Sequence, residues 1–195
     1  MISLKFEPKP GILKLPNRFL TAAFDGHTNE ALKEIAEEFI ENFAEYYVNG
    51  IAPAFFGPPG IGKTHVAAVI AKLLHNKQGV PVYWADTVQT LNKIMDYRDF
   101  RNSAYFRIKK DLTQIPLVVL DDFGHMQDFT RTRELFFEIV NTRYSRKLPT
   151  IFTANISAGV TQESWEQLDN ICGSAVTRRI KVMSKGLLFV GGLND

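Results

Sequence analysis

The hydrophobic positions of this chain fall into two alternating patterns. Short runs dominated by apolar residues occur at residues 51–56, 80–85, 117–120, 150–154 and 187–190. Apolar residues at helical spacing occupy residues 28–49, 66–74, 87–95, 130–146 and 162–184. Short continuous apolar runs are typical of parallel strands that are buried on both faces. The alternation therefore predicts an α/β fold, in which a parallel five-stranded sheet lies between two layers of helices.

The first 27 residues do not share this pattern. They contain scattered apolar residues among several helix and strand breakers, namely Pro8, Pro10, Gly11, Pro16 and Gly26. Such a composition favours an extended arm over a folded unit. A chain of 195 residues has the size of one domain. We therefore expect an arm over residues 1–27 and a single three-layer domain over residues 28–195.

The first helix of that domain is predicted to run without a break over residues 28–49. Its apolar residues keep helical spacing throughout, and Thr28 or Asn29 is suited to cap its first turn. Gly50 follows directly and is suited to end it. This helix leads into the first predicted strand.

The composition limits the classes of function. With 23 basic and 21 acidic residues the net charge is only +2, so contact with nucleic acid requires a local basic patch. The single cysteine, Cys172, excludes an internal disulfide and a multi-cysteine zinc site, and it fits a reducing compartment. No apolar run approaches the roughly 20 residues of a membrane-spanning helix, and the N-terminal residues lack the core of a signal peptide. We therefore expect a cytoplasmic protein without membrane contact.

One sequence motif is complete and lies in the context that it requires. Between a predicted strand and a predicted helix, the pattern Gly-x-x-x-x-Gly-Lys-Thr is matched by Gly57, Pro58, Pro59, Gly60, Ile61, Gly62, Lys63 and Thr64. In such a loop backbone N–H groups surround the phosphates, the lysine reaches the β- and γ-phosphates, and the threonine hydroxyl ligates Mg²⁺. The sequence therefore predicts a site for a nucleoside triphosphate and Mg²⁺.

Two carboxylates end the third predicted strand. Asp121 and Asp122 follow the apolar residues 117–120, which is where a magnesium-dependent NTPase places its second metal contact and the base that activates water. We expect Asp121 to hold Mg²⁺, through water, and Asp122 to orient or deprotonate the attacking water. Paired aspartates also form turns, but the complete phosphate loop upstream favours catalysis. No Asn-Lys-x-Asp motif for guanine is present, so ATP is favoured over GTP.

Asn155 ends the fourth predicted strand. In a doubly wound sheet a polar amide at this tip lies between the two carboxylates and the γ-phosphate, so Asn155 is a candidate for holding the attacking water. A turn residue at the end of a strand is the competing interpretation. The order of phosphate loop, acidic strand end and polar strand end is the order found in AAA+ ATPases, where the last position is called sensor 1.

The motifs together resemble the DnaC/IstB branch of the AAA+ superfamily. The resemblance covers roughly residues 28–190 and rests on the phosphate loop with His65, on residues 120–124, and on the stretches Ile-Val-Asn-Thr-Arg-Tyr (139–144) and Leu-Pro-Thr-Ile-Phe-Thr-Ala-Asn (148–155). This branch contains bacterial and phage loaders of replicative helicases and ATP-dependent helpers of transposition. It implies a three-layer P-loop core without a separate helical lid, and the roughly 40 residues after Asn155 agree with that.

The resemblance also implies an arginine that acts between subunits. Arg179 lies at the corresponding place, with Arg178 as the alternative and an ordinary solvated helix face as the competing interpretation. Arg143 is left open, either as a residue that acts across a subunit boundary or as the partner of a carboxylate in its own helix. An intersubunit arginine implies that the ATPase is slow as a monomer and completed by a neighbouring subunit.

A basic stretch is the candidate surface for nucleic acid. Residues 93–110 carry six basic and two acidic residues interleaved with aromatic ones, a composition suited to single-stranded DNA. The candidate contacts are Arg98, Arg101, Arg107, Lys109 and Lys110. The same stretch lies where loaders and initiators of this superfamily insert an extra helix that faces a central pore. The alternative is that the aromatic residues pack in the core and the charges face water.

The expected function is that of an ATP-dependent replication factor, which assembles with itself on single-stranded DNA and loads or remodels a replicative helicase. An IstB-like transposition helper is the alternative within the same branch, and it would prefer duplex DNA. Residues 1–27 are shorter than the helicase-binding domain of known loaders, so helicase and transposase both remain open as partners. A P-loop kinase for small molecules is more remote, and an ATP-gated binding module with little hydrolysis also remains open because Asp122 is shorter than glutamate.

Overall fold

The computed structural model describes residues 4, 6, 13, 15–24, 29–100, 102–126, 130–156 and 162–191. Strands and helices alternate along them. The strands are β1 (Ala54–Gly57), β2 (Val82–Asp86), β3 (Leu117–Asp121), β4 (Thr150–Asn155) and β5 (Leu188–Val190). The α-helices are α1 (Glu30–Glu41), α2 (Phe43–Asn49), α3 (Lys63–Gln78), α4 (Thr87–Asp99), α5 (Ala104–Gln114), α6 (Thr130–Ser145), α7 (Gln162–Cys172) and α8 (Ser174–Met183). Two short 3₁₀ helices are η1 (Asn17–Phe19) and η2 (Phe123–His125).

The five strands form one sheet in the order β2-β3-β4-β1-β5, and every neighbouring pair is parallel. Because the strands are parallel, their carboxyl ends meet at one edge of the sheet. Gly57 at the end of β1 pairs with Asn155 at the end of β4, and Leu120 near the end of β3 pairs with Phe152. The phosphate loop, the aspartates and the asparagine are therefore neighbours.

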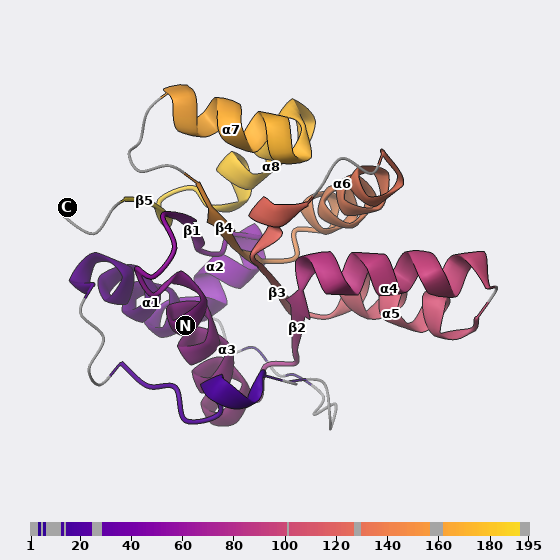
Figure 1. Cartoon of the computed structure of the whole chain (residues 1–195). Coiled ribbons are helices and arrows are strands. Elements are labelled where there is room, and N and C mark those ends of the chain that lie inside the picture. The colour runs from indigo at the N-terminus through magenta and orange to yellow at the C-terminus, as the bar shows by residue number, and fades with distance from the viewer. Residues whose placement is uncertain are drawn as a thin grey trace.

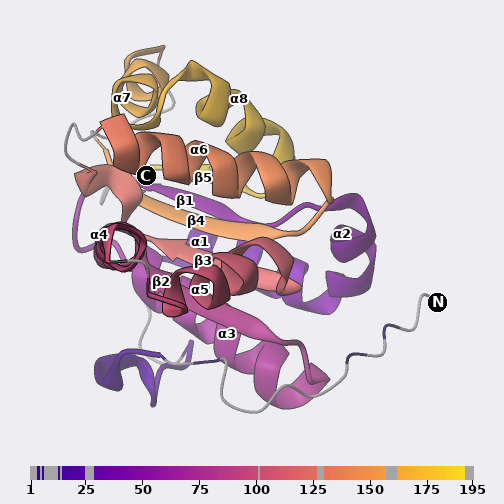
Figure 2. The same ribbon diagram turned by 90° about the vertical axis from the view of Figure 1, so that its right-hand side faces the viewer.

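Helices cover both faces of this sheet, as Figures 1 and 2 show. Side chains alternate along each strand. In β3, Leu117 and Val119 join the core beneath α1, α2 and α3, whereas Val118 and Leu120 join the core beneath α4 to α8. The predicted three-layer architecture is thus confirmed. Within the described ranges, α7 and α8 pack into the second core and no separate lid domain is formed.

The prediction of one unbroken helix over residues 28–49 is wrong. Helix α1 ends at Glu41 and α2 begins at Phe43, and Asn42 between them has the non-helical angles φ −103° and ψ 21°. The side-chain amide of Asn42 donates to the carbonyl oxygen of Glu38, so an asparagine competes with the backbone pattern here. The change of direction keeps Phe43 buried, with its ring 5.5 Å from that of Phe39.

The part of the N-terminal segment around η1 lies against α3 (Figure 1), whereas Phe6 packs against Phe43 and Tyr47 of α2. Lys72 Nζ donates to the carbonyl oxygen of Ala22 at 2.8 Å, and His65 Nε2 lies 2.8 Å from that of Ala23. Residues 17–24 are therefore attached to the helix that begins at the phosphate loop. None of the helices in the described ranges is both long enough and apolar enough to cross a bilayer.

Candidate nucleotide-binding site

The phosphate loop joins β1 directly to α3. Strand β1 ends at Gly57 and α3 begins at Lys63, so the first turn of the helix points its N–H groups and positive dipole end at the loop. Gly57 has φ +149°, and a Cβ atom there would lie 2.2 Å from the carbonyl oxygen of Gly191. Gly62 has φ +97°. Glycine is required at Gly57 because the chain after β5 crosses it closely.

Lys63 is buried among oxygen atoms of the loop and of β4. Its Nζ donates to the carbonyl oxygens of Gly57 at 3.0 Å and Pro58 at 2.7 Å, and to Asn155 Oδ1 at 2.9 Å. Burial lowers the pKa of Lys63, and the carboxylates of Asp122 and Asp121 oppose this change. The ammonium group is therefore held at the mouth of the loop, where a phosphate finds a cation that is only partly solvated.

Asp121 accepts hydrogen bonds from two hydroxyl groups. Its Oδ1 lies 2.9 Å from Thr64 Oγ1 and 2.7 Å from Thr153 Oγ1. Burial raises the pKa of Asp121, and the two hydrogen bonds work against this rise. The structure thus brings together Thr64 and Asp121, the two residues predicted to serve Mg²⁺. A hydroxyl beside a carboxylate fits this ion, which takes few protein oxygens together with phosphates and water.

Asp122 and Asn155 are joined at the ends of β3 and β4. Asp122 has φ +48° and ψ +52°, and its N–H donates to Thr153 Oγ1 at 2.8 Å. Asn155 Nδ2 donates to Asp122 Oδ1 at 2.9 Å. Since Asn155 Oδ1 also accepts from Lys63, one amide group connects the lysine of the phosphate loop with the second aspartate. The three strand ends therefore form one polar network.

Two residues at these strand ends, one in the network and one packed against it, were given no role from the sequence. Thr153 bridges the neighbouring aspartates, since it donates to Asp121 and accepts from Asp122. A Cβ atom on Gly124 would lie 2.9 Å from the carbonyl oxygen of Asn155, so η2 approaches the end of β4 as closely as only glycine allows. Alternation along β4 could have identified Thr153, because it shares a face with Asn155.

A cavity of about 460 Å³ opens beside the loop, and it includes part of the N-terminal segment. The lining residues are Arg18, Phe19, Pro59, Gly60, Gly62, Lys63, Thr64, His65 and Asn155. The Phe19 ring lies 6.4 Å from the His65 ring, and the Arg18 guanidinium lies 4.7 Å from the Phe19 ring centre. Arg18 and Phe19 were missed because η1 has no sequence motif and reaches the cavity only through tertiary packing.

The three arginines considered as intersubunit residues lie in different environments. Arg179 lies on α8 and is half-buried, with Nε 3.0 Å from Asn141 Oδ1. Arg178 is exposed. Arg143 is fully buried, and both roles considered for it are contradicted. Within the described residues its guanidinium donates only to uncharged oxygens, namely the carbonyl oxygens of Leu112, Ile115, Pro116 and Pro149 and the Thr150 hydroxyl.

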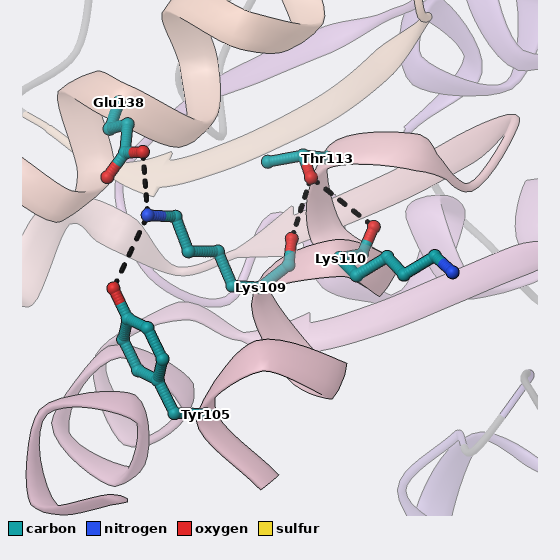
Figure 3. A network of polar contacts seen from close by, with 5 residues as sticks. All are labelled: Tyr105, Lys109, Lys110, Thr113 and Glu138. Atoms are coloured by element: carbon teal, nitrogen blue, oxygen red, sulfur yellow. Dashed lines mark hydrogen bonds and ion pairs between the residues drawn. The ribbon is translucent and has the colours of Figure 1, made fainter. Parts of the chain in front are cut away.

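The candidate residues for nucleic acid divide into two groups. Arg98, Arg107 and Lys110 are exposed, and Arg101 lies outside the described residues. Arg98 forms a long ion pair with Asp99 at 3.7 Å on the surface. Lys109 is less exposed and pairs with Glu138 of α6 at 2.7 Å and with Tyr105 Oη at 3.3 Å, while Lys110 points away from Glu138 (Figure 3). The ammonium group of Lys109 therefore joins α5 to α6.

The aromatic residues of the same stretch also divide. Phe100 is 84% exposed and Phe106 is 74% exposed. Tyr105 packs against the second core, and Tyr97 is half-buried. The idea that these rings all pack in the core is therefore wrong for Phe100 and Phe106, which remain available at the surface.

The fold and the site define a P-loop ATP-binding core of the AAA+ class. The family described as "IstB-like ATP binding protein" matches residues 26–186, and the chain belongs to this family. The replicative helicase loader DnaC of Escherichia coli K12 is 27% identical over 154 residues, which are 77% of this chain and 55% of that protein. The chain thus matches little more than half of the length of this relative.

Two further comparisons agree with this assignment. The putative ATP-binding protein of insertion sequence IS232 from Bacillus thuringiensis subsp. berliner is 29% identical over 117 residues, or 58% of this chain and 42% of that protein. A crystal structure of the DnaC helicase loader superimposes with a TM-score of 0.79 at 27% identity, covering 89% of this chain and 99% of that chain. The predicted resemblance to the DnaC/IstB branch is confirmed.

Proposed function

We propose that this protein is a magnesium-dependent ATPase that assembles with further copies of itself on single-stranded DNA and loads or remodels a replicative helicase. The observation that carries the ATPase part is the network in which Asn155 bonds both Lys63 and Asp122. The loader part is supported by the similarity to DnaC over 77% of this chain. Each part has its own test.

In the proposed site, ATP enters the cavity beside the phosphate loop. Lys63 and the N–H groups at the start of α3 bind the phosphates. Thr64 and Asp121 hold Mg²⁺, which when bound neutralises charge on the β- and γ-phosphates. The ring of Phe19 offers the base a surface for stacking, and Arg18 lies at the same wall of the cavity.

Asp122 and Asn155 are proposed to hold the attacking water. Asp122 supplies a carboxylate that accepts a proton or a hydrogen bond, and Asn155 fixes the position of that carboxylate. Thr153 holds the backbone of Asp122 through its N–H. These contacts keep the reacting groups in place before ATP arrives, which lowers the entropic part of the barrier.

The site is proposed to be completed by Arg179 of a neighbouring copy. An added guanidinium neutralises charge that develops on the transferred phosphoryl group. Turnover per site should then rise with protein concentration. Arg179→Ala should retain ATP binding and lose turnover, because the substitution leaves the phosphate loop intact.

Single-stranded DNA is proposed to bind along α4 and α5. Arg98, Arg107 and Lys110 are exposed cations for the phosphates, and Phe100 and Phe106 are exposed rings for the bases. Arg98 stays in the proposal because its ion pair with Asp99 is long, 3.7 Å, and lies at the surface. Lys109 is removed from this proposal because it pairs with Glu138. A transposition helper is the second candidate, and the similarity to the IS232 protein favours it.

The decisive measurement is ATP turnover as a function of protein concentration and of added DNA. We expect turnover per site to increase with concentration and with single-stranded oligonucleotide, and to be absent in Lys63→Ala. Turnover that is independent of both would refute the assembled ATPase. Stronger binding to duplex than to single strands would instead support the transposition helper, and co-purification with a helicase or a transposase from host extract would identify the partner.

A further inference from the structure

The segment Asn-Thr-Arg-Tyr of α6 directs its side chains to opposite sides of the helix. Arg143 points into the protein and bonds oxygens at the end of α5 and the start of β4. Asn141 and Tyr144 lie three residues apart on the outer face, and Phe137 lies one turn before Asn141. These three outer side chains all contact the same residue of α8, Arg179.

The contacts hold the guanidinium of Arg179 along one edge. Nε donates to Asn141 Oδ1 at 3.0 Å, and Nη1 donates to the carbonyl oxygen of Ala175 at 2.7 Å. The guanidinium carbon lies 5.1 Å from the Phe137 ring centre and 5.6 Å from that of Tyr144. The other terminal nitrogen, Nη2, forms no hydrogen bond with any residue in the described ranges. One edge is therefore fixed while the other keeps donors for a further acceptor.

This arrangement lies at the surface. The Phe137 and Tyr144 side chains are 39% and 40% exposed. Phe137 and Ala175 also line a surface cavity of about 460 Å³. Arg178, the preceding residue, is exposed and forms no hydrogen bond or ion pair within the described part of the chain. Of the two adjacent arginines, therefore, only Arg179 has its guanidinium held by contacts with other described residues.

The side-chain acceptor of Arg179, Asn141 Oδ1, is uncharged. An amide oxygen orients a guanidinium without neutralising it, whereas a carboxylate would form an ion pair. An arginine whose planar fork is already oriented loses less freedom when it binds an anion. Both features suit an arginine that acts on phosphate and not one that only joins two helices.

We propose that Asn141, with the rings of Phe137 and Tyr144, positions Arg179 for the phosphates of ATP bound in a neighbouring copy of this chain. The proposal rests on the composite ATPase site proposed above. Asn141 is a positioning residue, since it acts through Arg179. It follows that Arg179 rather than Arg178 is the intersubunit arginine.

The test uses Asn141→Asp in the full chain. Asn141→Asp keeps an acceptor of the same shape and strengthens the bond to Arg179, so a merely structural contact would be preserved. The new charge neutralises the guanidinium and opposes phosphate, so we expect turnover per site to fall at least about tenfold, toward the roughly 100-fold to 1,000-fold that loss of one charge-stabilising donor costs. Binding of a fluorescent ATP analogue should match that of the wild type.

A mixing experiment shows in which subunit Asn141 acts. Lys63→Ala subunits cannot bind ATP but keep Arg179 and its contacts, whereas Asn141→Asp subunits keep the phosphate loop. Each variant alone should be nearly inactive, and an equimolar mixture should recover turnover. Lys181→Ala serves as the matched control, because it removes an exposed cation of α8 that lies over the Trp165 ring, and it should turn over ATP at the wild-type rate.

The outcomes separate this proposal from the one on which it rests. If Arg179→Ala loses turnover while Asn141→Asp keeps it, the positioning role is wrong and the composite site stands. If Arg179→Ala turns over ATP normally, the composite site itself fails. Loss of turnover in Asn141→Asp that mixing does not restore would mean that Asn141 supports only its own subunit, which also overturns the proposal.

Discussion

Replacing the buried Arg143 by lysine should destabilise the fold strongly, although the charge is kept. The side chain is fully buried. It forms five hydrogen bonds, to the carbonyl oxygens of Leu112, Ile115, Pro116 and Pro149 and to the Thr150 hydroxyl. Burial lowers the pKa of Arg143 to about 9, so the group is still a cation at neutral pH. The planar guanidinium therefore matters for its number of donors as well as its charge.

The magnitude follows from counting donors. A lysine ammonium has three N–H donors, so at least two of the five acceptors lose their partner. A buried polar group left without a partner costs about 1–3 kcal/mol. The expected loss is therefore about 2–6 kcal/mol, a large part of the roughly 5–15 kcal/mol that stabilises a typical domain.

Urea unfolding followed by the fluorescence of Trp84 and Trp165 measures this loss as a lower midpoint at unchanged slope. Arg146→Lys is the matched control from the turn directly after the same helix, because Arg146 is exposed and makes one long bond, 3.4 Å to the Thr113 carbonyl oxygen. Its effect should stay within about 0.5 kcal/mol. If Arg143→Lys unfolds at the same urea concentration as the wild type, the five acceptors do not require arginine and the reasoning is refuted.

Three further substitutions test separate parts of the site. Thr153→Val removes the hydroxyl that fixes Asp121, so turnover should fall about tenfold while ATP affinity is kept; unchanged turnover would remove Thr153 from the mechanism. Phe19→Ala should weaken binding of an ATP analogue about tenfold and leave saturated turnover unchanged, and equal affinity would contradict base stacking. Lys110→Ala should reduce the slope of log binding constant against log salt concentration, measured with single-stranded DNA, by about 0.7. Lys109→Ala should leave this slope unchanged, because Lys109 pairs with Glu138. If both variants give the same slope, the proposed difference between the two lysines is wrong.

The sequence predicted the features that depend on local motifs and on the alternation of strands and helices. The phosphate loop Gly57 to Lys63, the two aspartates and Asn155 all lie at or directly after the carboxyl ends of strands, and the alternation of strands and helices places these ends at one edge of a parallel sheet. Because a parallel sheet brings carboxyl ends together whatever the order of its strands, the grouping of these residues could be inferred without the strand order. The roles of the residues within the group remain predictions.

The sequence could not predict what depends on contacts between distant segments. Arg143 reads as a polar residue on an amphipathic helix, and its burial follows from acceptors such as Leu112 that are 31 residues away. Lys109 belongs to a basic stretch, yet it forms an ion pair with Glu138 of another helix. Phe19 reaches the cavity only because Lys72 and His65 hold the backbone that follows it against α3.

Helix α6 connects the interior of the candidate site with the surface proposed to meet a neighbouring copy. Arg143 fastens α6 to Thr150 at the start of β4, and β4 ends at Asn155 beside Lys63. The outer face of the same helix holds Arg179. A satisfied network of buried hydrogen bonds is rigid, so the position of Arg179 should depend on Arg143. We expect Arg143→Lys, assayed at a temperature where it is folded, to lose turnover at unchanged ATP affinity. Normal turnover would show that Arg143 stabilises the fold without fixing the position of Arg179.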